Sequence, residues 1–147
     1  MDTPIQQLAV VGAGAMGSGI AALYAAKEVQ VVLIDPMPGA LDRAVQTIQR
    51  QLDSYAPGST QQAIERIRLA SELEAASSCD LLIEAVPEKL ELKRELLAKL
   101  DKLCAPHTIF ATNTSGLSIN TIAEAVTRRD RFVGAHFFTP ADVIPLV

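Results

Sequence analysis

A glycine-rich turn near the start of the chain has the spacing G-x-G-x-x-G. It follows an apolar, β-branched run and opens an alanine-rich stretch, which is the strand–turn–helix context in which such glycines bind a dinucleotide. We predict that Gly12 makes the tight turn, Gly14 lets the backbone approach a pyrophosphate, and Gly17 lets helix and strand pack closely. The unpaired amides at the start of the next helix would face the phosphates. The predicted phosphate-binding residues are Gly12, Ala13, Gly14, Ala15, Met16 and Gly17.

A carboxylate, Asp35, ends the next apolar run, about twenty residues after the glycine turn. There it can accept hydrogen bonds from both hydroxyls of an adenine ribose, and it would repel the 2′-phosphate of NADP. These residues therefore favour NAD over NADP. Two alternatives stay open, because Asp35 can serve as a helix cap or turn residue and because FAD-binding folds share this glycine turn.

The two histidines differ in their place along the chain. His136 follows the last predicted strand, at the edge where parallel strands end and ligands bind. His107 precedes a strand, and we predict that it lies in a surface loop at the opposite edge. His136 is thus the candidate functional histidine, with a hydrogen-bonded structural histidine as the alternative. Asn113 and Ser115 follow another strand at the same edge, either as ligand-binding groups or as cap and turn residues of the next helix.

These residues need a scaffold, and strands alternate with helices along the whole chain. The strands are continuously apolar, which predicts an α/β fold with a doubly wound, Rossmann-type parallel sheet and helices on both faces, in one domain over residues 1–147. The clearest helix follows Pro87, with Glu88 and Glu91 in its first turn, Lys99 and Lys102 in its last turn, and an apolar stripe of Leu92, Leu96, Leu100 and Leu103. The expected strands are residues 5–11, 29–34, 67–70, 80–86, 108–112 and 131–135. The other expected helices are 16–26, 40–52, a short one from residue 63, and 118–126.

Composition narrows the class of protein. The chain is 49% hydrophobic and 20% charged, so it can bury a core. Its net charge is −4 and its basic residues form no cluster longer than a pair, so we expect no nucleic-acid partner. The uncharged run over residues 8–26 is interrupted by glycines, and we expect neither a signal sequence nor a membrane anchor. Cys79 and Cys104 lack metal-site spacing; we expect buried thiols, no bound metal and a cytoplasmic location.

Three stretches resemble the NAD-binding domain of the L-3-hydroxyacyl-CoA dehydrogenases. They are VVGAGAMGSGIAALYAAKEVQVVLID (10–35), DLLIEAVPEKLELK (80–93) and TIFATNTSGLSINTIAEAVTRRDRFVGAHFFTPADVIPLV (108–147). The resemblance implies NAD-dependent oxidation of the 3-hydroxyl of an (S)-3-hydroxyacyl-CoA to the 3-ketoacyl-CoA, in fatty acid or related acyl-CoA metabolism. It also implies that His136 is the catalytic base and that Ser115 hydrogen-bonds the substrate oxygen. The residues that it places at the nicotinamide end of NAD are Glu88, Lys93 and Asn113. Ala85 and Val86 are also predicted to bind the cofactor.

The chain departs from the family pattern in three places. Thr139 stands where the family usually has Asn, and the glutamate that the family pairs with its histidine would fall one place beyond Val147. The segment between Asp35 and Asp80 has no lysine, whereas mitochondrial members hold the CoA tail there with a lysine and a serine, so the acyl carrier stays open.

The family also has a helical C-terminal domain that closes the substrate cleft and forms a homodimer. We therefore expect this chain to be one domain of a longer protein. The alternatives are a carnitine or sugar-acid dehydrogenase of the same superfamily and a non-catalytic NAD-binding module.

Overall fold

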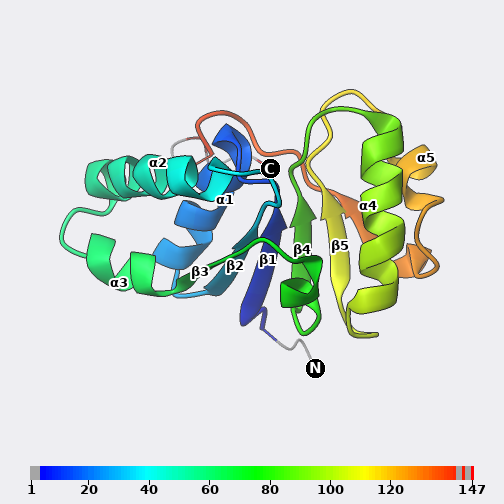
Figure 1. Ribbon diagram of the computed structural model, residues 1–147, viewed down its shortest axis with the longest axis horizontal. Coiled ribbons are helices and arrows are strands. Elements are labelled where there is room, and N and C mark those ends of the chain that lie inside the picture. The colour runs from blue at the N-terminus through cyan, green and yellow to red at the C-terminus, as the bar shows by residue number, and fades with distance from the viewer. Residues whose placement is uncertain (1–3, 142–143, 145–146) are drawn as a thin grey trace.

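The computed structural model describes residues 4–141, 144 and 147, and these residues form one six-stranded parallel sheet (Figure 1). The strand order is β3-β2-β1-β4-β5-β6, so the chain winds outward from β1 in one direction and then crosses back to continue from β4 in the other. This confirms the predicted doubly wound α/β fold. The strands are β1 (Gln7–Val11), β2 (Gln30–Ile34), β3 (Ile67–Ala70), β4 (Leu81–Glu84), β5 (Ile109–Thr112) and β6 (Phe132–Gly134).

Helices cover both faces of the sheet (Figure 1). One face packs against α1 (Ala15–Ala26), α2 (Ala40–Tyr55) and α3 (Thr60–Glu65). The other packs against the 3₁₀ helix η1 (Leu73–Ala76), α4 (Leu90–Leu103) and α5 (Ile119–Ala123). A second 3₁₀ helix, η2 (Arg129–Arg131), leads into β6, and neither 3₁₀ helix was predicted.

The central strand β1 shows why the strands are continuously apolar. Leu8 and Val10 point into the core beneath α1–α3, whereas Ala9 and Val11 point into the core beneath α4 and α5, and all four are at most 1% exposed. Alternate side chains of a strand point to opposite faces, so a sheet covered on both sides needs apolar residues at every position.

The predicted details of α4 are partly wrong. The helix begins at Leu90, so Glu88 precedes it instead of lying in its first turn. Its buried face consists of Lys93, Leu97 and Leu100, whereas Leu92 is 40% exposed. The leucines of this helix fit two overlapping faces, so their pattern alone does not decide which face is buried. The buried face is the one that contains Lys93, and the leucine pattern did not indicate it.

A further predicted boundary also shifts. The helix α2 extends to Tyr55, beyond the predicted end at residue 52. The segment predicted as a short helix turning into a strand is confirmed as α3 followed by β3.

The two cysteines are buried free thiols, as predicted, and they lie together in the core beneath α4. The carbonyl oxygen of Ala76 accepts from the Cys79 amide at 3.2 Å and from Cys104 Sγ at 3.5 Å. The hydrogen bond with Cys104 and the burial of the site raise the pKa of the Cys79 thiol. Both side chains therefore act as small core residues.

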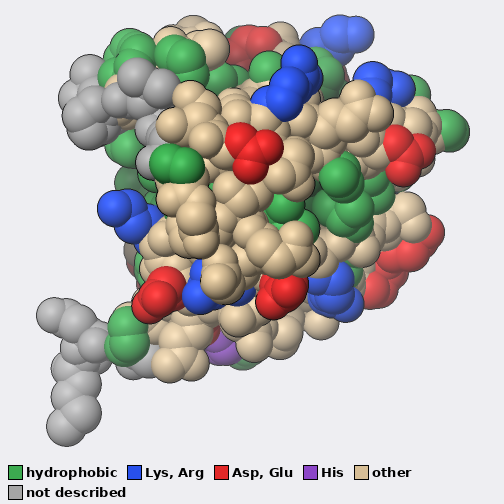
Figure 2. All heavy atoms as spheres, turned by 90° about the vertical axis from the view of Figure 1, so that its left-hand side faces the viewer, with side chains coloured by type: hydrophobic (Ala, Val, Ile, Leu, Met, Phe, Trp, Pro, Cys, Tyr) green, Lys and Arg blue, Asp and Glu red, His purple; other side chains and the backbone are tan. Residues whose placement is uncertain are grey.

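The molecular surface mixes charges of both signs. On the side that carries α2 and α3, Figure 2 shows Lys and Arg side chains interspersed with Asp and Glu. His107 is exposed at the edge of the sheet where the strands begin, as predicted, with Nε2 at 3.3 Å from Asp80 Oδ1. Within the described residues, no helix combines the length and hydropathy needed to cross a bilayer.

Candidate cofactor and substrate cleft

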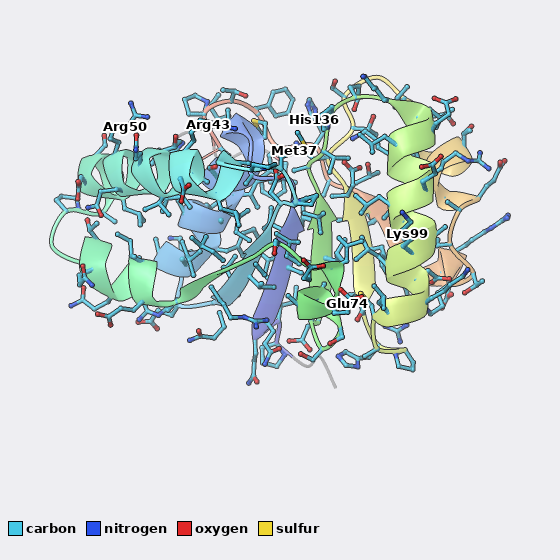
Figure 3. The ribbon with its side chains drawn as sticks, in the orientation of Figure 1. Met37, Arg43, Arg50, Glu74, Lys99 and His136 are labelled. Carbon is cyan, nitrogen blue, oxygen red and sulfur yellow. The ribbon has the colours of Figure 1, made fainter. Side chains whose placement is uncertain are left out.

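The candidate site lies at the edge where the six parallel strands end. Figure 3 shows His136 and Met37 at this edge and Glu74 toward the opposite one. The strand order reverses between β1 and β4, and in such sheets ligands bind in the crevice that this reversal opens.

The glycine turn between β1 and α1 has the predicted shape. Gly12 has a φ of 106°, a conformation that strongly favours glycine, and a Cβ there would lie 2.6 Å from the carbonyl oxygen of Ala85. A Cβ on Gly17 would lie 1.8 Å from the carbonyl oxygen of Gly12. The predicted roles of Gly12 in the turn and of Gly17 in close packing are confirmed.

Gly14 differs from these two glycines, because a Cβ built on it would meet no atom within 4 Å. Its surroundings are open, at the start of a helix that no side chain of the described residues caps. Uncapped amides and the positive end of the helix dipole attract a phosphate group. This end of α1 therefore fits a pyrophosphate.

Asp35 lies directly after β2 and is tied to the glycine turn. Its Oδ2 accepts a hydrogen bond from the Ala13 amide at 2.8 Å, and its Oδ1 accepts one from the Met37 amide at 2.9 Å. An ionised carboxylate has about four acceptor sites, so two amide donors leave capacity for ribose hydroxyls. The turn role and the predicted ribose role of Asp35 are thus compatible.

A cleft of about 430 Å³ opens on the β4–β6 side of the glycine turn. It brings together both predicted catalytic residues with six of the predicted cofactor residues, whereas the other residues of the glycine turn and Asp35 lie outside its lining. The predicted residues that line it are Met16, Ala85, Val86, Glu88, Lys93, Asn113, Ser115 and His136. The cleft is also lined by Phe137, Phe138 and Thr139, for which no role in the site was predicted.

Glu88 joins the loop after β4 to the loop after β5. Its Oε1 accepts hydrogen bonds from Thr114 Oγ1, from the Ser115 amide at 3.0 Å and from the Gly116 amide at 3.1 Å. Burial alone would raise the pKa of this carboxyl group, but these donors together with Lys93 outweigh it and lower the pKa to about 2. Glu88 therefore stays anionic and fixes the backbone that carries Ser115.

The segment around His136 is held by contacts on both sides of the cleft. Asn113 Oδ1 accepts a hydrogen bond from the Phe137 amide at 2.8 Å, and the rings of His136 and Phe138 lie 4.8 Å apart. Thr139 Oγ1 donates to Met16 Sδ at 2.8 Å, so the residue that departs from the family pattern contacts the glycine turn. His136 is half-buried, and because it lines the cleft its ring is accessible from there.

Two buried polar residues behind the cleft escaped the sequence analysis. Glu84 and Thr112 are the last residues of β4 and β5, both are 0% exposed, and Thr112 Oγ1 donates to Glu84 Oε2 at 2.6 Å. The only sequence signal was a single charged residue inside an otherwise apolar strand. Among the described residues, no group of three or more His, Cys, Asp or Glu side chains could hold a metal ion.

Comparison with known proteins identifies the family of this scaffold. Residues 7–147 match the family described as "3-hydroxyacyl-CoA dehydrogenase, NAD binding domain". The chain belongs to this family. As a member of an NAD-binding domain family it takes NAD as its cofactor, and the open turn at Gly14, the uncapped helix and the carboxylate of Asp35 fit that dinucleotide.

Individual members of the family are similar over nearly the whole chain. Hydroxyacyl-coenzyme A dehydrogenase, mitochondrial, from Rattus norvegicus is 42% identical over 97% of this chain, and 3-hydroxyadipyl-CoA dehydrogenase from Escherichia coli is 38% identical over 97%. The crystal structure of 3-hydroxybutyryl-CoA dehydrogenase from Escherichia coli superposes with a TM-score of 0.91 at 37% identity, covering 97% of this chain and 31% of that one. The chain spans 49% of the rat relative and 31% of the 3-hydroxyadipyl-CoA dehydrogenase.

Proposed function

We propose that this domain belongs to an enzyme that oxidises the 3-hydroxyl of an (S)-3-hydroxyacyl-CoA to a 3-ketoacyl-CoA with NAD, in fatty acid or related acyl-CoA metabolism. The observation that carries the proposal is the single cleft that His136 and Ser115 share with the residues predicted to face the nicotinamide. The relatives named for hydroxyacyl-CoA substrates support the choice of substrate class.

In the proposed reaction, the 3-hydroxyl of the substrate lies between His136 and Ser115. His136 removes the hydroxyl proton, since an imidazole can accept and return protons near neutral pH. Ser115 donates a hydrogen bond to the same oxygen, and Glu88 fixes its backbone through the amide at 3.0 Å. The bound nicotinamide supplies the acceptor for the hydride that leaves the substrate carbon. Glu88 holds the loop that carries Ser115, and Asn113 holds the segment beside His136.

The rest of the proposal concerns the longer protein. We propose that the active form includes a further domain and is a homodimer, and that the cytoplasm is its location. The last point rests on the sequence analysis alone, because relatives carry both mitochondrial and peroxisomal names.

The test begins with parallel titrations of this chain with NADH and NADPH, followed by nicotinamide fluorescence. We expect selective binding of NADH, and binding of neither nucleotide would overturn the cofactor assignment. Acetoacetyl-CoA is then added to the longest natural form of the protein with NADH, and oxidation of NADH is expected. The His136→Gln variant should keep its NADH affinity and lose turnover by orders of magnitude, whereas near-normal turnover would exclude His136 as the base.

A further inference from the structure

Two oppositely charged side chains are fully buried behind the wall of the cleft. Glu84 ends β4 and is 0% exposed, and Lys93 lies in α4 and is 1% exposed. Lys93 Nζ lies 2.7 Å from Glu84 Oε1. Burying such a pair carries a large desolvation cost, and a pair of apolar residues often stabilises a fold equally well. Stability alone therefore gives no reason for this pair at this position.

Three acceptors surround the ammonium group of Lys93. Besides Glu84 Oε1, Nζ contacts the carbonyl oxygen of Val86 at 3.2 Å and Glu88 Oε2 at 3.2 Å. Lys93 thus joins the end of β4 to the loop that follows it, and it also borders the cleft.

Glu84 is also held by neighbouring groups. Its Oε1 also accepts a hydrogen bond from the Val86 amide at 2.8 Å, and its Oε2 accepts the bond from Thr112 Oγ1. The pair thus forms hydrogen bonds with both the amide and the carbonyl group of Val86 and an ion pair with one carboxylate oxygen of Glu88. The other carboxylate oxygen of Glu88 holds the loop that carries Ser115.

We propose that Lys93 and Glu84 are positioning residues, which hold the Val86 carbonyl and the Glu88 carboxylate in place at the nicotinamide side of the cleft. In this arrangement Lys93 acts on the cleft through Glu88 and Val86, in addition to the cofactor contact predicted for it from the sequence. This role rests on the proposed use of the cleft for NAD.

Binding measurements on this chain test the proposal with two ligands, NADH and ADP-ribose. ADP-ribose lacks the nicotinamide ring, so it reports on the adenine and pyrophosphate side alone. The variants are Lys93→Met, Glu84→Gln and the combination of the two. Lys93→Met leaves the buried Glu84 without a charged partner, and Glu84→Gln leaves Lys93 with Glu88 alone. Each single change is therefore expected to lower the melting temperature. The combination removes both charges and should recover much of that loss.

We expect the combined variant to bind NADH on the order of tenfold more weakly, as the loss of a charge-assisted hydrogen bond predicts, with ADP-ribose affinity unchanged. Lys99→Met is the matched control, because Lys99 is an exposed lysine of the same helix (Figure 3). Wild-type NADH affinity in a folded combined variant would overturn the proposal. Equal weakening of both ligands would also overturn it, because it would show a general structural effect.

A second variant keeps the test informative if the buried changes prevent folding. Glu88 is 40% exposed at its side chain, and Glu88→Gln leaves the buried Lys93 still paired with Glu84. It should weaken NADH and spare ADP-ribose, and an unchanged NADH affinity would exclude Glu88 as the group through which Lys93 acts. A failure of the proposed use of the cleft for NAD would look different, because the wild-type chain itself would then bind no NADH.

Discussion

The side-chain oxygen of Asn113 accepts a hydrogen bond from the backbone amide of Phe137 at 2.8 Å. This contact joins the loop after β5 to the segment that follows β6, immediately beside His136. Phe137 is 4% exposed, so water cannot easily replace the acceptor. Asn113 was predicted as a cofactor contact, and the structure shows that it also sets the position of the residue next to the candidate base.

Asn113→Ala should therefore destabilise the chain. The variant leaves the buried Phe137 amide without an acceptor, which costs about 1–3 kcal/mol. Urea denaturation of this chain measures the change. Asn113→Asp is the control, because it keeps an acceptor oxygen at the same place and should lose less. Equal stability of wild type and Asn113→Ala would show that another group satisfies the amide.

The glycine turn allows stability and binding to be separated. In Gly17→Ala the new methyl group would lie 1.8 Å from the Gly12 carbonyl oxygen, so we expect a loss of about 4 kcal/mol or more, or no folding. In Gly14→Ala the methyl group meets open space, so the fold should persist. The methyl group would occupy the space at the N-terminus of α1 where the pyrophosphate is expected to bind. NADH affinity should therefore fall on the order of tenfold. Circular dichroism and NADH titration of both variants check this, and a Gly14→Ala variant with full affinity would contradict the assigned pyrophosphate position.

Local sequence signals predicted the scaffold and the location of the site. Short apolar runs bounded by turns indicated every strand, and the rule that ligands bind where parallel strands end placed Ser115 and His136 in one cleft. Gly12 and Gly17 were predictable because their roles depend on the neighbouring turn and helix alone.

The contacts that complete the site had no such signal. Glu88 reaches Thr114, and Asn113 reaches Phe137, between segments more than twenty residues apart. The burial of Lys93 was missed because a lysine in a helix is normally solvated, and only the carboxylate of Glu84 at the end of a neighbouring strand makes burial possible. Such pairings depend on the folded arrangement, which helical periodicity does not encode.

Glu28 offers a stabilising change remote from the cleft. It has a φ of 67°, in the left-handed region that side chains with a Cβ disfavour. Its contact with Arg66, at 3.8 Å and with Glu28 83% exposed, contributes little. Glu28→Gly should raise the unfolding free energy by about 0.5–1 kcal/mol, which is the strain relieved less the added flexibility of the unfolded chain. The melting temperature should rise by a few degrees. Glu28→Gln keeps the Cβ and should change neither, and a destabilised glycine variant would contradict the strain argument.

The clamp formed by Glu88 and its donors in the loop after β5, Thr114, Ser115 and Gly116, should make part of the unfolding free energy depend on pH in the acid range. The pKa of Glu88 is lowered from 4.5 to about 2 in the folded state, so the folded chain binds fewer protons at this site than the unfolded chain does. Its contribution is therefore fully present above about pH 4.5 and is lost as the pH falls toward 2. Urea denaturation of wild type and Glu88→Gln across this range measures it. The wild type should be the more stable of the two above pH 4.5, and their difference should shrink toward pH 2. Glu91→Gln, which changes an exposed carboxylate outside the clamp, is the control. A difference that stayed constant with pH would mean that the donors around Glu88 do not distinguish its charged form from its neutral one.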